Sequence, residues 1–155
     1  KTKMESMRRA IKKLPLASKV TCSGAVPGEE VAMFLSNHRA HDALKQNRLY
    51  EMLSCDPDYI DAYGLEVVAG RGFSEEYGDD VNKLVINETA ARMLGYVDND
   101  DAIGEEIAVE TLGEPMQVIG VVKDYHQQAL NKGYTGVMLS IKIRLIGFLS
   151  VISQS

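Results

Sequence analysis

Tryptophan is missing from this 155-residue chain, and aromatic residues make up only 6% of it. Any core must therefore be built from aliphatic side chains and methionine. The length is enough for one domain with its own core, or for two small lobes that share one. With 45% hydrophobic and 25% charged residues, the composition is that of a globular protein and argues against disorder over most of the chain.

Long apolar runs are also missing. No window reaches the ~18 uninterrupted apolar residues that a membrane-spanning helix requires. The nearest candidate, residues 137–152, is interrupted by Lys142 and Arg144. The chain begins with Lys1 and shows no signal peptide, so we expect an excised segment that is soluble as given, although its parent protein need not be.

Cysteine is scarce, because Cys22 and Cys55 are the two in the chain. Two cysteines do not decide the redox compartment. Both fall within predicted strands, where a thiol usually behaves as a small buried apolar group. We therefore expect two buried thiols, with a disulfide between them as the alternative.

Positive charge is scarce after the first nineteen residues. Those residues hold seven basic side chains and one acidic side chain, a net charge of +6, while the rest holds ten basic and twenty-one acidic, a net charge of −11. Phosphate binding needs a basic face on the folded domain, so we expect no nucleic-acid partner. The basic start is typical of a surface helix, or of a segment that contacts membrane headgroups.

Nucleotide-binding and nucleophile motifs are absent. The chain has no Gly-x-x-x-x-Gly-Lys-Ser/Thr run, so any ATP hydrolysis must take place on another chain or domain. No serine lies in a Gly-x-Ser-x-Gly elbow, and neither cysteine has a histidine beside it in sequence. The residues alone give little support to an enzyme.

Histidine supplies two weak candidates for chemistry. His38 and His41 are three residues apart with Asp42 beside them, and on a helix they would share a face that could hold a metal. We favour a solvated loop there, because no further ligand is evident. His126 could act as a general base next to Asp124, but a packed, hydrogen-bonded histidine is the favoured interpretation.

Aspartates at positions 98, 100 and 101 resemble the start of a calcium loop. An EF-hand needs an oxygen ligand at its fifth position and glycine at its sixth, and Ala102 and Ile103 stand there instead. The match fails, and we expect no metal or other cofactor.

Two further polar patterns have simple structural explanations. A second acidic group, between residues 75 and 80, is expected to be a solvated face, because no apolar pocket nearby would separate the carboxylate pKa values. Asn87 and Thr89 fit a glycosylation triplet, but a helix cap at Asn87 is the stronger interpretation. The acidic group consists of Glu75, Glu76, Asp79 and Asp80.

Apolar periodicity predicts short elements throughout the chain. Apolar side chains recur at steps of three and four in residues 1–14, which predicts a helix that Pro15 ends. Short apolar or alternating runs predict strands at residues 16–23, 31–35, 48–55, 65–69, 83–86, 106–110, 116–122, 139–145 and 148–153.

The segments between these strands are predicted to be loops and short helices. Residues 37–47 lack a period and are expected to form a loop or a frayed helix. Asp56 is expected to cap a helix that ends at Gly64, and Asn87 a helix over residues 88–94. Residues 125–130 are expected to form one helical turn.

The stretch 61–76 is the most informative part of the chain. Glycines punctuate a strand-length apolar run at positions 64, 70 and 72. We expect Leu65, Val67 and Val68 to be core residues, and likewise Leu49 and Leu53 in the preceding strand.

Five segments in the right order resemble the periplasmic core domain of MacB-like and FtsX-like ABC-transporter permeases. The most recognisable is C-D-P-D-Y-I-D-A-Y-G-L-E-V-V-A-G-R-G-F-S, followed by V-I-N-E-T-A-A-R-M-L-G. The matching segments are residues 14–30, 55–74, 85–95, 102–107 and 116–126. After residue 130 the similarity is weak.

The resemblance implies an α+β fold: a mixed β-sheet with a few short helices, as a β-α-β lobe plus a smaller β-rich lobe in some members. It implies a non-catalytic domain outside the inner membrane that transmits ATP-driven motion to a substrate or partner protein. We then expect residues 1–14 to be a membrane-proximal helix and residues 15–155 the extracytoplasmic core. Apolar spans of about 20 residues would flank the chain in its parent protein.

The implied partners are the protein's own transmembrane helices and the membrane surface, a separate cytoplasmic ATPase, a periplasmic partner or substrate protein, and a second copy in a dimer. Two alternatives remain open. One is a peptide- or lipid-binding sensor module of another membrane protein. The other is a small hydrolase that uses His126 or the acidic group.

Overall fold

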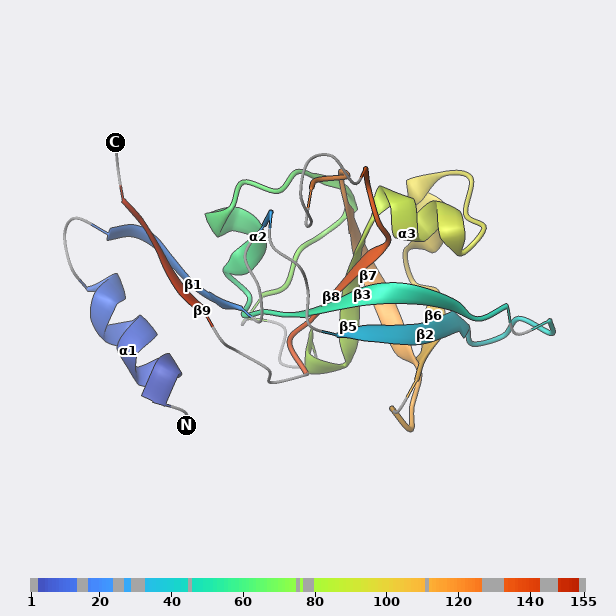
Figure 1. The fold of residues 1–155 in the computed structure, drawn as a ribbon, viewed down its shortest axis with the longest axis horizontal. Helices are drawn as coiled ribbons and strands as arrows, with labels where there is room; N and C mark the ends of the chain where they lie inside the picture. Colours follow the sequence, from blue (N-terminus) through green and yellow to red (C-terminus); the bar gives the residue numbers. More distant parts are fainter. Residues whose placement is uncertain are drawn as a thin grey trace.

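A computed structural model describes most of the chain. The described residues are 3–13, 17–23, 27–28, 33–44, 46–74, 76, 80–110, 112–126, 133–142 and 148–153. They form an α+β fold in which a mixed sheet carries a few short helices, as the sequence predicted (Figure 1).

Seven strands form the main sheet, in the order β4-β7-β5-β8-β3-β2-β6. Pairs β5–β7 and β3–β8 are parallel and the others antiparallel. Because β6 pairs with both β2 and β7, the sheet curls until its ends meet. The strands are β2 (Phe34–Arg39), β3 (Arg48–Ser54), β4 (Val67–Gly70), β5 (Lys83–Asn87), β6 (Glu106–Val109), β7 (Met116–Val122) and β8 (Val137–Ser140).

Toward its middle this sheet is buried on both faces, since alternate side chains along its central strands enter different clusters. On β3, Tyr50 and Met52 pack with helix α3 (Glu88–Met93) on one side. Leu53 packs on the other side with Tyr59 of helix α2 (Tyr59–Ala62). Short 3-10 turns η1 (Asp80–Asn82) and η2 (Asn99–Ala102) complete the lobe.

Strand β7 holds the sheet together because three strands pair with it. Strand β5 occupies one edge, while β6 and β4 share the other edge end to end. Gly120 lies where β4 pairs and where the register with β5 shifts. A Cβ atom at Gly120 would collide with the backbone carbonyl of Arg71, so only glycine permits this approach.

A separate arm extends from the sheet. Helix α1 (Lys3–Lys12) packs on a two-stranded antiparallel ribbon of β1 (Ala17–Ser23) and β9 (Phe148–Ser153). Figure 1 shows the arm, with both chain ends, at one extremity of the molecule, and the β2–β3 hairpin pointing the opposite way. No helix among the described residues is long and apolar enough to cross a membrane.

Most predicted elements are confirmed, but several boundaries were wrong. Strand β2 begins at Phe34 and runs through residues predicted to be a loop, ending at Arg39. It pairs with both β3 and β6, and this tertiary pairing outweighs its polar sequence. Strand β8 ends at Ser140 with all four residues buried, instead of alternating to position 145, and residues 143–147 lie outside the description. The helical turn predicted at 125–130 falls largely on undescribed residues.

Three predicted core residues are not in the core. Leu49 is 65% exposed because its side chain lies on the outer face of the β2–β3 hairpin. Val67 and Val68 are partly exposed because β4 is an edge strand with an irregular register at this point. Leu53 is buried as predicted, and Leu65 is partly buried against the α2-side cluster.

Helix α2 begins later than predicted. Its N-cap is Asp58, which makes no side-chain capping bond, whereas the Asp56 carboxylate accepts a hydrogen bond from the backbone N–H of Asp58 at 3.1 Å. Gly64 ends the helix with a positive φ of 64°, as predicted.

The close approach at Gly120 gives a stability test. Gly120→Ala should lower the free energy of unfolding by about 3 kcal/mol, because backbone must move to accommodate the new methyl group. Gly113→Ala is the matched control, since nothing lies within 4 Å of a Cβ there, and it should change stability by less than about 0.5 kcal/mol. Urea titration followed by circular dichroism measures both, and equal effects would contradict the packing account.

Candidate functional site

The arm and the sheet meet at a buried hydrogen bond. Thr21 of β1 is fully buried, and its hydroxyl donates to the Asp56 carboxylate at 2.5 Å. The same carboxylate oxygen accepts from the backbone N–H of Asp58, which begins α2. One anionic group therefore fixes both the arm and α2, and hydrogen bonds to a charged group are stronger than neutral ones.

Backbone pairing reinforces this joint. Ser23 at the end of β1 forms an antiparallel bridge with Cys55. The backbone N–H of Cys55 donates to the carbonyl oxygen of Ser140 in β8 at 3.1 Å. A continuous backbone path thus runs from the arm ribbon into the main sheet, and we call Thr21, Ser23, Cys55 and Asp56 the joint.

The groups beside the joint are held in their neutral forms. Burial, followed by the charge of Asp56, raises the pKa of the Cys55 thiol well above its ordinary value. Burial likewise raises the pKa of Tyr59 and of Tyr125. Cys55 is a free, buried cysteine, as favoured from the sequence. A protonated, inaccessible thiol is a poor nucleophile.

Asp80 departs from the solvated acidic face predicted for its group. It is only 2% exposed, and both of its oxygens accept from the Arg71 guanidinium at 2.8 Å. The backbone N–H of Ser74 adds a third bond at 2.8 Å. The Arg71 hydrogen bonds hold the pKa of Asp80 below its usual value. Of the remaining group, Glu76 is exposed as predicted, and Glu75 and Asp79 lie outside the described residues.

His38 and His41 do not form a metal site. His38 lies on β2 with its Nδ1 atom 2.8 Å from the side-chain oxygen of Asn47, whereas His41 lies in the following turn, 3.1 Å from Glu106. Residues 37–39, which were predicted to be a loop or a frayed helix, belong to strand β2 instead. The two rings therefore lie on different elements, with His38 in the strand and His41 in the turn after it. Among the described residues, no three His, Cys, Asp or Glu side chains come together as metal ligands.

The other sequence candidates also have structural roles. His126 stacks on Tyr134 with ring centroids 4.5 Å apart. Asp124, its supposed partner, instead binds Arg92 and the backbone N–H of Thr89, each at 2.8 Å. A catalytic pair between His126 and Asp124 therefore has no support from the hydrogen bonds.

Asn87 is the predicted helix cap. Its side-chain oxygen accepts from the N–H of Ala90 at 2.9 Å and of Val137 at 3.0 Å, and its nitrogen donates to the carbonyl oxygen of Thr135. A buried amide with these bonds is not available for glycosylation.

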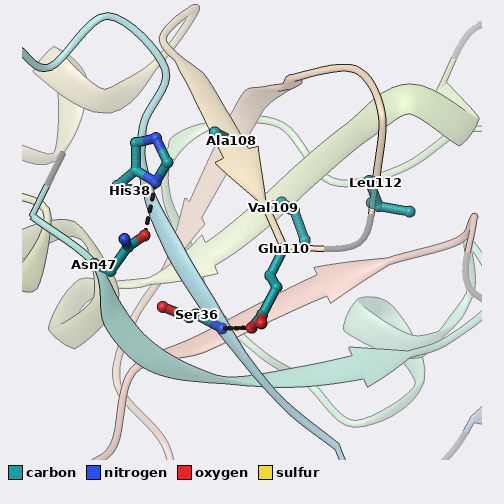
Figure 2. A pocket seen from close by; sticks show the side chains of 7 residues that line it. All are labelled: Ser36, His38, Asn47, Ala108, Val109, Glu110 and Leu112. Carbon is teal, nitrogen blue, oxygen red and sulfur yellow. Dashed lines mark hydrogen bonds between the residues drawn. The ribbon is translucent and has the colours of Figure 1, made fainter.

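A shallow hollow of about 330 Å³ lies on the outer face of the sheet (Figure 2). Strand β2 contributes Ser36 and His38, and the end of β6 contributes Ala108, Val109 and Glu110. The Glu110 side chain extends from the end of β6 toward β2, where its carboxylate accepts a hydrogen bond from the backbone N–H of Ser36 at 2.9 Å. Asn47 and Leu112 close the lining.

Sequence reasoning missed the joint. Thr21 and Asp56 are 35 residues apart, and no local pattern links them. Asp56, which precedes Pro57, was the one member of this bond that the sequence marked, and it was predicted to be a helix cap.

Comparison with solved structures places this fold among the extracytoplasmic domains of transporters. The extracellular domain of the noncanonical ABC-type transporter YknZ from Gram-positive bacteria is similar, with a TM-score of 0.67 and 18% identity, covering 97% of this chain and 73% of that one. The periplasmic region of MacB from Actinobacillus actinomycetemcomitans has a TM-score of 0.63 and 18% identity, covering 89% of this chain and 54% of that one. This chain therefore spans about half of the MacB region.

The fold is thus that of the extracytoplasmic domain of an ABC-transporter permease. A family model described as the MacB-like periplasmic core domain matches residues 5–150, and the chain belongs to that family. No curated protein matches the chain.

The Arg71–Asp80 pair gives a pH-dependent test. Asp80→Asn should destabilise the fold by about 2 kcal/mol at pH 7, because charge-assisted bonds are lost from a buried position. The folded-state pKa lies below the unfolded value of about 3.9, so this contribution is complete above pH 4 to 5 and is lost as pH falls toward the folded pKa.

Urea titrations of wild type and variant at pH 7, 5 and 3 measure the difference. The two stabilities should converge as the pH falls, whereas the exposed control Asp100→Asn should show little difference at any pH. A gap that is as large at pH 3 as at pH 7 would contradict the assignment.

Proposed function

We propose that this domain transmits ATP-driven motion of a membrane-embedded permease to a substrate or partner protein outside the membrane. The observation that carries the proposal is the joint, where a buried hydrogen bond and a backbone bridge tie the arm to the sheet. A displacement of the arm then moves α2 and β8 directly, instead of being absorbed by a loop.

The arm has the character of an input element. Helix α1 packs on β1 and also contacts β9, so it and the ribbon form one unit. Five basic residues lie between positions 3 and 13, which suits a position near anionic headgroups. In this proposal residues 1–14 are the membrane-proximal helix and residues 15–155 the extracytoplasmic core, with transmembrane helices of the same protein beyond them.

The domain itself acts without catalysis in this proposal. Support comes from the neutral, buried thiol of Cys55 and from the separation of the histidines and carboxylates that a hydrolase would need. ATP hydrolysis would take place on a cytoplasmic ATPase, and the full-length permease would act as a dimer in the inner membrane.

Breaking the joint should uncouple the arm from the sheet. In the full-length permease with its ATPase, reconstituted in nanodiscs, hydrogen exchange of the β1 and α2 peptides should change together between ADP and trapped-ATP states. Thr21→Val removes the donor but keeps the side-chain shape. A lost bond of about 1.4 kcal/mol corresponds to a roughly tenfold weaker coupling equilibrium.

The expected result is that Thr21→Val weakens the nucleotide response in α2 about tenfold, because the Ser23–Cys55 backbone bridge remains, while the response in α1 and the ATPase rate persist. Thr135→Val is the matched control, since the hydrogen bond from Asn87 uses the Thr135 backbone carbonyl, and it should leave the α2 response intact. An α2 response in Thr21→Val that is as large as in the wild type would refute transmission through the joint.

A further inference from the structure

The outer face of strands β6, β2 and β3 carries an exposed apolar row. Phe34, Ser36 and His38 share this face because side chains alternate along a strand. Leu49 of β3 pairs with Ser36 of β2, so the two side chains lie on the same face of the sheet. Phe34 is 49% exposed and Leu49 is 65% exposed. Glu51, opposite Phe34 on the same face, is buried, so the exposed part of the face begins at Phe34 and Leu49. Large exposed apolar side chains that neighbour each other are typical of an interaction site.

An acidic row runs beside the apolar row. Glu106, Ala108 and Glu110 alternate outward on β6 and just beyond it, whereas Ile107 and Val109 point inward and are buried. One oxygen of Glu110 binds the N–H of Ser36, and Glu106 lies 3.1 Å from the 81%-exposed ring of His41. Residues 98–114 contain seven acidic side chains and no Lys, Arg or His. The face therefore has two large apolar side chains, Phe34 and Leu49, on one side and two carboxylates, Glu106 and Glu110, on the other.

The hollow described above is lined by members of both rows, Ser36 and His38 on β2 and Ala108 and Glu110 at β6 (Figure 2). A sheet face in a globular protein is ordinarily covered by a helix. Here the described helices pack elsewhere, and Figure 1 shows the β2–β3 hairpin projecting away from α1 and α2. A helix whose apolar stripe meets Phe34 and Leu49 would bring its flank over Glu106 and Glu110.

We propose that this outer face binds an amphipathic helix of a partner protein that carries a basic stripe beside its apolar stripe. The acidic row selects lysine and arginine, and the apolar row supplies the buried contact. The inference rests on the proposed function only in placing the partner outside the membrane. It names the chemistry of that partner, which the joint does not determine.

A designed peptide probe tests the surface directly. The probe is a helix of about five turns, with leucine on one face and lysine beside it, and its twin replaces each lysine by glutamate. NMR titration of the 155-residue chain should shift the amides of Phe34, Ser36, Leu49 and Glu110 with the lysine peptide. The glutamate twin should bind at least about tenfold more weakly.

Two variants and their matched controls locate the contact. Leu49→Ser and Glu106→Lys should each weaken binding of the lysine peptide by about tenfold, through the loss of apolar contact and of charge attraction respectively. Val97→Ser and Glu66→Lys make the same chemical changes at exposed positions on other elements and should leave the affinity within about twofold.

Several results would overturn the proposal. They are shifts centred on residues 98–101 instead of the outer face, equal weakening by Glu66→Lys and Glu106→Lys, or no binding at ~1 mM peptide. Self-association of the free chain that Leu49→Ser abolishes would assign the face to a second copy and likewise contradict a helical partner. None of these outcomes affects the test of the joint, which does not involve this face.

Discussion

The fold depends on the crowding of three strands around β7. Strand β5 takes one edge, while β6 and β4 divide the other, so Met116–Val122 joins the two ends of the main sheet. In this arrangement the backbone of Arg71 packs directly against β7 at Gly120, and the contact is possible because glycine has no Cβ atom. The Arg71–Asp80 pair then fixes the segment that leaves the contact. In the proposed transmission, a load applied at one strand of this closed sheet would reach the others through their backbone hydrogen bonds.

The joint supplies the point at which such a load would enter. The arm reaches the sheet through a carboxylate that also anchors α2, and through a backbone bridge that continues into β8. The proposed helix-binding face lies on the β2–β3 hairpin, which points away from the arm (Figure 1). In the proposal, the input at the joint and the output at the hairpin would therefore lie at opposite ends of strand β3. The chain belongs to the MacB-like periplasmic core domain family, so this arrangement is that of a domain outside the membrane.

Much of the fold could be predicted from sequence because its signals are local. The run at residues 83–95 has an apolar strand, a cap at Asn87 and a closing glycine, and the structure shows each of them. The alternating or apolar runs at residues 106–110 and 116–122 predicted strands that the structure shows as β6 and β7. The predicted strand at residues 31–35 overlaps only the start of β2, because polar residues 37–39 are held in the strand by its neighbours on both sides.

The sites were harder to predict because they are made by contacts distant in sequence. Thr21 meets Asp56, and the acidic row of β6 lies beside Phe34 and Leu49 only through sheet pairing. Leu49 looked like a core residue because an apolar side chain gives no indication of which face it occupies. Asp80 looked like a solvated charge because nothing nearby in sequence indicated that Arg71 would enclose it.

The central claim is that arm and sheet move as one body. Double electron–electron resonance in the full-length permease tests it, with spin labels on unnatural amino acids at the exposed positions Ala10 in α1 and Asp61 in α2, which leaves the native cysteines untouched. The account predicts that the distance between these two labels stays the same in ADP and trapped-ATP states, while the distance between equivalent labels on two copies changes. A change between α1 and α2 within one copy, with the sheets of the two copies stationary, would contradict it.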